Sequence, residues 1–581
     1  MKKQQISKIA CAVKLWLFLV FLVAPVMMAQ AQFTFTTNSD GSLTLAQYTG
    51  PGGPVVIPGT TNGLPITSIG YTAFFNNSTL TSVAVGTNVA SIADQSFSYS
   101  SLTNVTLPDS VTNIAFDAFL DCNQLTAITV ATNNPDFSSV AGVLFNQNRT
   151  TLIGFPEGKA GSYAVPDSVT NIGVYAFFDS TNLTSLAIST NVSSIEDYAL
   201  YDCPGLTAIT VNTNNLWYSS VAGVLFDKRQ GTLIQYPAGN AASAYTMPNT
   251  VTNIGMEAFY GCPNLISVTL GTNVAIVGDA AFQYCQVLAS ISFPNSVTVI
   301  GGDAFAECAG LTNITIGTGV TNILAQAFLG CASVTAIAVA AGNPDFSSVG
   351  GVLFDKNQTA LVLYPAASSG TSYVIPDSVT NIVEDAFMDA YNLAGITLGA
   401  HVQSIGDSAF QECYSLTSIT IPNGVTSLGF NTFYDCVSLT NVVIGSGLND
   451  IGFQVFSYCY NLAGVYFTGN APAMNSDVFD DDNAGTAYYL PGTAGWSATF
   501  DDLPTAVWLP QIVASGVRTN QFSFYVDWAS GQTVVVEGCT NLSRPVWSPL
   551  QTNLITSGSW YFSDPQWTNY PGRFYRALAT D

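Results

Sequence analysis

The sequence has 581 residues, with 13 Lys or Arg against 37 Asp or Glu, so its formal net charge at pH 7 is −24. So acidic a chain repels nucleic acid and anionic membrane surfaces, and these two classes of partner are excluded. Only 9% of the residues are charged, so Ser, Thr, Asn and Gly must supply most of the polar surface.

Residues 1–31 have the pattern of a secretory signal peptide. Four lysines precede an apolar run over residues 15–28, and Ala29 and Ala31 frame a small-x-small cleavage site. We therefore expect cleavage after Ala31 and a secreted or cell-surface protein. No comparable apolar run follows, so no transmembrane segment is expected after cleavage. Removing the four lysines would leave nine basic and 37 acidic residues, a net charge of −28.

Residues 32–59 are predicted to form an N-terminal β cap. Residues 33–37 and 43–45 alternate apolar and polar side chains on either side of Asn38-Ser-Asp-Gly41, which predicts a hairpin-like pair. Such a pair would cover the apolar end that the first unit of a repeat array otherwise exposes.

Residues 60–506 consist of one unit repeated about 14 times around a central apolar residue. Ten of the thirteen steps between successive central residues are 22 or 23 residues long, and the other three are 58, 59 and 59. A fixed period of this length indicates a solenoid, whose units must stack to bury a core. The central residues are Phe74, Phe97, Phe119, Phe177, Leu200, Phe259, Phe282, Phe305, Phe328, Phe387, Phe410, Phe433, Phe456 and Phe479.

Each unit predicts a strand, a turn, a second short strand and a short helical turn. Residues 416–421 have the L-x-x-L-x-L spacing of a leucine-rich-repeat strand, in which Ser418 and Thr420 point outward. A turn at residues 422–424 leads to a second apolar strand at 425–428, and the helical turn then carries Phe433 into the core. The predicted fold is a repeat solenoid, a right-handed leucine-rich-repeat coil of parallel β-strands with short helical turns.

In many units an acidic residue lies near the start of the predicted helical turn. There a carboxylate meets backbone N–H groups that have no partner within a helix. These acids are Asp117, Glu257, Asp279, Asp303, Asp385 and Asp407.

Cysteine recurs three residues after the central position. One cysteine per coil places the thiols in a column about 4.8 Å apart, and no coil offers the C-x-x-C spacing of a metal site. Other coils have Ser100, Ser180 or Ala390 at this position, so we expect buried thiols outside any disulfide, acting as small core residues. The cysteines of the column are Cys122, Cys203, Cys262, Cys285, Cys308, Cys331, Cys413, Cys436 and Cys459.

The three long steps each contain a related insert, near residues 134–168, 215–250 and 343–378. All three share the motif S-S-V-A/G-G-V-L-F, a polar turn, and an apolar run ending in F/Y-P, which predicts a hairpin in an enlarged coil. Between Gln32 and Pro504 every basic residue lies in these inserts, either as a solvated hairpin tip or as part of a row of protrusions suited to a partner's acidic groups. These candidate partner-binding residues are Arg149, Lys159, Lys228, Arg229 and Lys356.

Residues 507–581 differ in composition from the repeats. Short β-like runs alternate with turn residues, which predicts a small all-β, sandwich-like C-terminal module. On an exported protein such a module is suited to attachment or sorting, a role suggested by analogy alone.

Residues 408–422, with the sequence Ser-Ala-Phe-Gln-Glu-Cys-Tyr-Ser-Leu-Thr-Ser-Ile-Thr-Ile-Pro, resemble the BspA-like leucine-rich repeats, the treponemal or type 5 class. The resemblance covers about residues 60–480. It implies a leucine-rich-repeat solenoid of the kind found in bacterial surface proteins, which act as adhesins for host or matrix proteins.

The sequence offers no catalytic constellation. Its single histidine, His401, lies in a turn without a nucleophile motif, so no catalytic, cofactor-binding or metal-binding residues are assigned and no enzyme is expected. We predict a monomeric extracellular recognition or adhesion scaffold that binds another extracellular protein or a surface polymer. The alternatives are a structural envelope or matrix protein without a specific ligand, and a carbohydrate-binding surface protein. An irregular patch on one edge would favour recognition, whereas uniform coil surfaces would favour a structural role.

Overall fold

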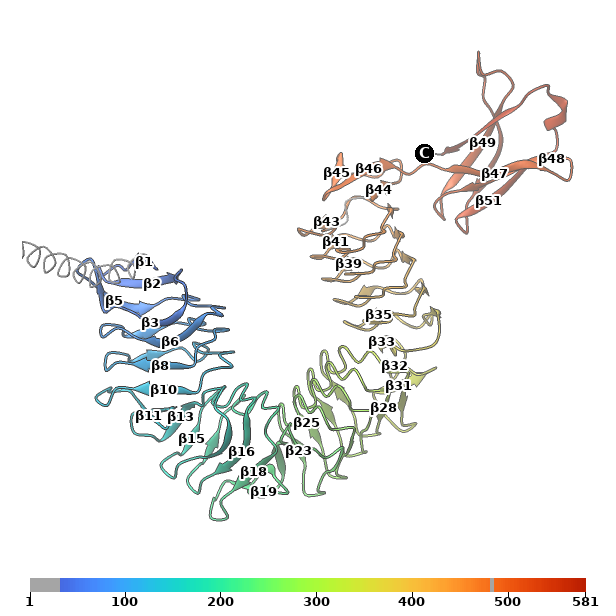
Figure 1. Cartoon of the computed structure of the whole chain (residues 1–581). Helices are drawn as coiled ribbons and strands as arrows, with labels where there is room; N and C mark the ends of the chain where they lie inside the picture. Colours follow the sequence, from blue (N-terminus) through green and yellow to red (C-terminus); the bar gives the residue numbers. More distant parts are fainter. Residues whose placement is uncertain (1–31, 481–484, 581) are drawn as a thin grey trace, which may run out of the picture. The chain divides into compact units, whose positions relative to one another are not determined.

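The computed structural model describes residues 32–480 and 485–580, and the predicted signal peptide lies outside them. The chain divides into two compact units, Met1–Gly310 with Asn322–Phe328, and Leu311–Thr321 with Leu329–Asp581. Within each unit, strands follow one another as the rungs of a β-solenoid, so the predicted solenoid of parallel strands is confirmed (Figure 1). The helical content of the described residues is one 3-10 turn, η1 (Trp567–Asn569). None of it could span a membrane.

The first unit begins with an antiparallel pair. Strand β1 (Phe33–Thr37) pairs with β2 (Leu43–Tyr48), and β2 then pairs in parallel with β5 (Leu64–Ile69). Leu45 and Ile69 are fully buried, so the hairpin covers the apolar end of the first coils. The parallel strands that follow are β7 (Ser91–Ile92) and β9 (Asn113–Ile114) in one sheet, and β3 (Gly53–Val56), β6 (Leu80–Ala84), β8 (Asn104–Leu107) and β10 (Ala127–Val130) in the other.

Each regular coil contributes one longer and one shorter strand to two separate sheets. In β38 (Ser418–Ile421) Ser418 and Thr420 are exposed while Ile419 and Ile421 are buried, as the alternation predicts. Two eight-stranded sheets result in the second unit. The first contains β31 (Phe346–Val349), β32 (Val352–Asp355), β33 (Ala360–Leu363), β35 (Asn381–Ile382), β37 (Ser404–Ile405), β39 (Ser427–Leu428), β41 (Asp450–Ile451) and β43 (Ala473–Met474). The second contains β34 (Ser372–Val374), β36 (Gly395–Thr397), β38, β40 (Asn441–Ile444), β42 (Gly464–Phe467), β44 (Thr486–Tyr489), β46 (Leu503–Val507) and β45 (Thr499–Phe500).

The turns that carry the central residues are not helical, in contrast to the prediction. On either side of Phe433, Asn431 and Asp435 have φ of 53° and 56°, and the same left-handed pair recurs from coil to coil. Two left-handed residues four positions apart are incompatible with an α-helix. Three of the acids predicted to cap a helix, among them Asp117, accept N–H groups of a neighbouring coil instead. Asp279 Oδ1 accepts from Gly302 at 2.8 Å, and Asp407 Oδ1 accepts from Phe430 at 2.8 Å.

The central aromatic rings form stacked ladders in the core. Phe259, Phe282 and Phe305 follow one another at centroid distances of 4.6 and 4.9 Å, with interplanar angles of 11° and 7°. The backbone of the turns forms a further ladder, in which Phe282 N–H donates to the Ala304 carbonyl at 2.7 Å. The turns therefore stack with the same fixed register as the strands.

Each insert supplies its own ring to the ladder, which explains the three long steps. Phe155 lies 5.2 Å from Phe177, Tyr236 lies 5.1 Å from Phe259 and Tyr364 lies 5.0 Å from Phe387. The remaining length of each insert forms an antiparallel hairpin. In the first insert the strands are β11 (Phe137–Val140), β12 (Val143–Asn146) and β13 (Thr151–Gly154), and their sheet continues with β15 (Asn171–Ile172) and β17 (Ser194–Ile195). In the second insert they are β19 (Tyr218–Val221), β20 (Val224–Asp227) and β21 (Thr232–Gln235), and their sheet continues with β23 (Asn253–Ile254), β25 (Ile276–Val277), β27 (Val299–Ile300) and β29 (Asn322–Ile323).

A buried asparagine fastens each insert to the coil before it. The Nδ2 group of Asn215 donates to the carbonyls of Ser189 and Val192, and its Oδ1 accepts the N–H groups of Trp217 and Tyr218, all at 2.8 Å. The equivalent residues Asn134 and Asn343 each make the same four bonds.

The C-terminal module is all-β, as predicted. Its two three-stranded antiparallel sheets share a core that includes Phe524, Val534 and Phe562. Two of its arginines pair with acids of the module, Arg573 with Asp564 and Arg576 with Glu537. The strands are β47 (Gln511–Arg518), β48 (Gln521–Asp527) and β51 (Ser559–Asp564) in one sheet and β50 (Ser548–Leu554), β49 (Thr533–Cys539) and β52 (Phe574–Ala579) in the other.

Candidate functional site

The three lysines among the predicted partner-binding residues are engaged within their own inserts. Lys159 Nζ donates to the Ala141 carbonyl at 2.8 Å. Lys228 Nζ donates to the Thr213 carbonyl at 3.3 Å and also to that of Asn215, and Lys356 Nζ donates to the carbonyl of Asn343. These ammonium groups therefore hold the insert backbone together.

The two arginines are both exposed in hairpin turns. Arg149 has φ of 57°, and Arg229 lies beside Lys228 in the turn after β20. Arg149 and Arg229 belong to different inserts of the first unit, and Lys356 belongs to the second unit. The arginines stay candidates for partner binding.

The cysteine column is buried, and its thiols take part in hydrogen bonds. The ten cysteines in the described part of the chain carry thiols rather than disulfides, and all are buried. In the column, Sγ donates to the carbonyl of a central residue one coil earlier, as Cys285 does to Phe259 and Cys413 to Phe387, at 3.1 and 3.2 Å. The column is part of the fold. Over residues 32–480 and 485–580, no group of three His, Cys, Asp or Glu side chains could hold a metal ion.

A row of seven aromatic side chains runs along the turns of the first unit, where the sequence analysis assigned no site. The ring centroids of neighbouring members are 4.0 to 5.9 Å apart, and Tyr198 contacts both Tyr175 and Tyr201. Three members are exposed, Phe116 at 70%, Tyr198 at 37% and Tyr284 at 41%. We call it the aromatic row; its members are Phe116, Tyr175, Phe178, Tyr198, Tyr201, Tyr260 and Tyr284.

Acidic groups accompany the aromatic row, and burial affects several of them. Burial, together with the charges of Asp202 and Asp121, raises the pKa of Asp179 to about 7. Burial, with the charge of Asp197, raises the pKa of Glu257 to about 8. Burial is also the main cause that raises the pKa of Asp202. This edge combines aromatic faces with carboxyl groups, and a cationic partner would stabilise the charged form of those carboxyl groups.

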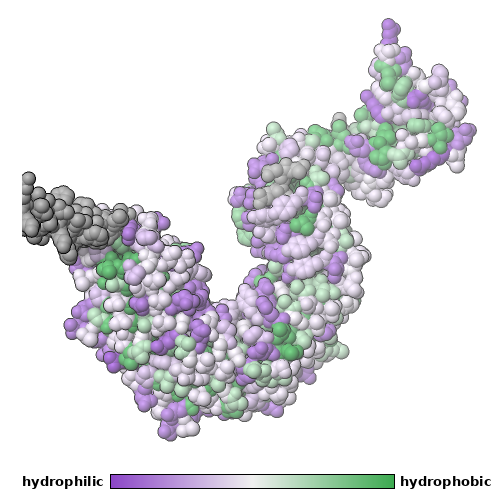
Figure 2. Space-filling view, in the orientation of Figure 1, coloured by the Kyte–Doolittle hydropathy of each residue, from purple (hydrophilic) through white to green (hydrophobic). Residues whose placement is uncertain are grey.

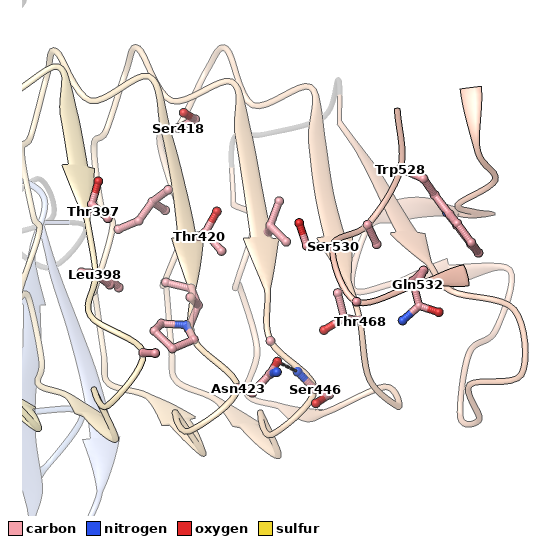
Figure 3. Close-up of a pocket in the computed structure, with 18 of the residues that line it drawn as sticks. Thr397, Leu398, Ser418, Thr420, Asn423, Ser446, Thr468, Trp528, Ser530 and Gln532 are labelled. Atoms are coloured by element: carbon pink, nitrogen blue, oxygen red, sulfur yellow. Dashed lines mark hydrogen bonds between the residues drawn. The ribbon is translucent and has the colours of Figure 1, made fainter. Parts of the chain in front are cut away.

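A groove in the second unit lies between the outward face of the repeat strands and the loop after β48 (Figure 3). Its volume is about 840 Å³, and none of its lining residues is Asp, Glu, Lys, Arg or His. The exposed side chains of Ser418 and Thr420 lie on one side, and Ser530 and Gln532 lie on the other (Figure 3). The loop is anchored by Trp528, whose Nε1 donates to the Trp508 carbonyl at 3.0 Å. The arrangement suits a neutral, hydroxyl-rich ligand.

The visible face of the protein agrees with the low content of charged residues. Figure 2 shows mostly pale residues of intermediate hydropathy, with hydrophilic and hydrophobic residues scattered among them. His401 is exposed in a turn, and its Nδ1 lies 3.2 Å from the carbonyl oxygen of Asp377.

The repeat region matches the family model described as the BspA type leucine rich repeat region. The match extends over residues 60–160, 154–221, 239–359 and 366–484, more than half of the chain. The chain belongs to the BspA-type leucine-rich repeat family. The residues that carried the resemblance in the sequence thus lie inside the matched stretches of this BspA-type protein.

Solved structures similar to this BspA-type chain come from several bacteria. A leucine-rich cell surface protein from Faecalibacterium prausnitzii is 23% identical, with 80% of this chain and 94% of that chain covered and a TM-score of 0.38. A leucine-rich repeat protein from Eubacterium ventriosum is 22% identical, with 68% and 90% covered and a TM-score of 0.38. One from Bacteroides ovatus is 21% identical, with 75% and 93% covered and a TM-score of 0.28. No curated protein matches the sequence.

Proposed function

We propose that this BspA-type protein is a non-catalytic recognition scaffold of the cell exterior, and that the aromatic row contacts a protein partner. The observation that carries the proposal is that contacting aromatic rings follow one another along the row, an arrangement that not every coil has. At the positions equivalent to Tyr175 and Phe178, the coil around Phe282 has Ala280 and Gln283, and the coil around Phe305 has Asp303 and Ala306. Because those coils stack in the same way, the fold does not require rings at these two positions.

The chemistry of the row favours a protein partner with basic groups. Aromatic side chains dominate the binding energy of many protein interfaces, and a cation gains from both ring faces and nearby carboxylates. The exported location rests on the predicted signal peptide and on the family. The arginines Arg149 and Arg229 are the alternative contact points, suited to acidic groups. A purely structural role would leave the row without a purpose.

Replacing Tyr198 and Tyr284 with serine tests the proposal. Both side chains are exposed, so the double variant is expected to keep its unfolding midpoint and to lose at least tenfold in binding. Binding would be measured against a panel of purified extracellular proteins, half basic and half acidic, coated on plates. The matched control is the Arg149→Ala and Arg229→Ala double variant. Equal binding by the wild type and the serine variant to every basic protein would refute the role of the row.

A second candidate function, binding of a neutral glycan, is favoured by the uncharged lining of the groove in the second unit. Thr420→Arg would fill the groove, and it is expected to abolish retardation of the protein in gels that contain soluble neutral polysaccharides. Thr129→Arg, at an exposed outward position of β10, is the matched control and should leave any retardation unchanged. Retardation that is unaffected by Thr420→Arg, or absent in the wild type, would count against this candidate.

A further inference from the structure

A partly open cavity lies between the first insert and the coils next to it. It has a volume of about 170 Å³ and lies between the coil of Phe119 and the ring that the insert supplies, Phe155. Its walls are mostly apolar and include Ile114, Leu144 and Ile153. Phe116 and Tyr175 of the aromatic row also line it, and Phe116 is 70% exposed. A volume of this size accommodates a group as large as a benzene ring.

Glu157 is the one charged side chain in the lining of this cavity. The residue is only 7% exposed. Its Oε1 accepts the N–H of Asp121 at 2.9 Å, whereas Oε2 is buried and has no hydrogen-bond partner among the described residues. A buried carboxyl oxygen in that state destabilises the protein, since it has lost water and gained nothing in return.

The other two inserts show that the fold does not need this acid. Glu157 follows the F/Y-P motif directly, and the same position holds Ala238 in the second insert and Ala366 in the third. Both alanines are buried in coils that are otherwise built alike. An acid that occurs once among three equivalent positions, at a cost in stability, points to a ligand.

The charges around Glu157 indicate which kind of ligand. Burial, followed by the charges of Asp179 and Asp121, raises the pKa of Glu157 to about 9. The nearest lysine in sequence, Lys159, donates its ammonium group to the Ala141 carbonyl. The backbone N–H groups of Asp121 and Cys122 partly offset these effects, but the other neighbours of the carboxyl group are acids and apolar side chains, and a cation would reverse the unfavourable balance.

We propose that the cavity binds a primary ammonium group carried on a short apolar stem. The ammonium donates to Oε2 of Glu157, and the stem lies against Ile114, Leu144 and Phe155. The rings of Phe116 and Tyr175 give the cation a second source of attraction. The site goes beyond the proposed recognition role, and its test needs no protein partner.

Binding is coupled to release of a proton. Because burial raises the pKa of Glu157 to about 9, its carboxyl group is expected to hold a proton at pH 7 in the empty site, and the incoming ammonium group keeps its own three. The carboxyl proton passes to the buffer, and an ion pair between carboxylate and ammonium forms. At most one proton is released for each amine bound.

Titration calorimetry of the full-length protein with hexylamine, in buffers of different ionisation enthalpy, tests the proposal. The wild type is expected to bind one hexylamine and to release close to one proton, whereas 1-hexanol binds at least tenfold more weakly without proton release. Glu157→Gln is expected to weaken hexylamine binding at least tenfold and to abolish the proton release. Asp303→Asn removes another acid of the same unit whose pKa is raised by burial, outside the cavity lining, and should change neither quantity.

The source of the ammonium group is distinguished by a second probe, Nα-acetyl-lysine methylamide. Glu157-dependent binding of hexylamine alone assigns the site to free amines, and binding of both probes assigns it to lysine side chains as well. Undetectable binding of both probes, or hexylamine binding that is equal in the wild type and Glu157→Gln, would overturn the proposal. Glu157→Ala, which introduces the residue of the other two inserts, provides a second folded variant for the same comparison.

Discussion

Replacing Asn215 with alanine is expected to lower the free energy of unfolding by about 4 kcal/mol, since four hydrogen bonds to backbone groups are lost at about 1 kcal/mol each. The side chain is fully buried, so no water replaces its amide at the carbonyls of Ser189 and Val192. The loss would be measured as a shift of the urea unfolding curve of the full-length protein. Because the asparagine joins insert to coil, the second insert should also become the first site of proteolytic cleavage.

The neighbouring residue provides the control. Asn214 is exposed, and its side chain makes none of these contacts, so Asn214→Ala should change stability by no more than about 0.5 kcal/mol. Asn215→Asp keeps an acceptor for Trp217 and Tyr218 but places an oxygen against two carbonyls, and it should be at least as destabilising as alanine. Equal stability of the Asn214 and Asn215 alanine variants would show that the four bonds contribute nothing.

The repeat period was sufficient to predict the fold because it reports directly on stacking. A residue that recurs every 23 positions lies one strand spacing from its counterpart, so Phe282 and Phe305 had to stack. The conformation of the turns was not available from the same period. Apolar spacing around Phe433 fits a helical turn as well as a turn with two left-handed residues, and only the backbone angles of Asn431 and Asp435 decide between them.

Part of the aromatic row could have been predicted from the sequence. Tyr175 and Tyr198 are one period apart, as are Phe178 and Tyr201, and the stacking argument applied to the cysteines applies equally to them. The step from Tyr201 to Tyr260 could not be predicted, because it crosses an insert whose length hides the coil that it contains.

The charged residues of the inserts show where sequence reasoning ends. The sequence identified the lysines as the rare cations of an acidic chain. Their hydrogen bonds to backbone carbonyls, such as that of Lys228, depend on the three-dimensional geometry of the insert, which the sequence pattern does not predict. The cavity near Glu157 depends on the same geometry. Comparison of the three inserts would still have singled out this acid against Ala238 and Ala366.

Stability of the wild type is expected to fall as pH rises from 5.5 to 8.5. Burial raises the pKa of Glu157 to about 9 and that of Glu257 to about 8, both from an ordinary value of 4.5. Between pH 5.5 and 8.5 the folded chain holds protons on these two groups that the unfolded chain has released. The contribution of the bound protons to stability is therefore complete below pH 4.5 and is lost as pH rises through the folded pKa. One such proton across three pH units corresponds to at most about 4 kcal/mol.

Glu157→Gln should flatten this dependence, because the amide cannot ionise and the variant becomes more stable than the wild type at pH 8.5. Urea unfolding midpoints at both pH values would measure the effect. Asp40 is the matched control: hydrogen bonds from Ser42 lower its pKa, so Asp40→Asn should leave the slope between pH 5.5 and 8.5 unchanged. A slope in Glu157→Gln equal to that of the wild type would mean that Glu157 ionises freely in the folded protein. An ionised Glu157 would then already be stable without a cationic ligand, and its buried Oε2 would no longer indicate one.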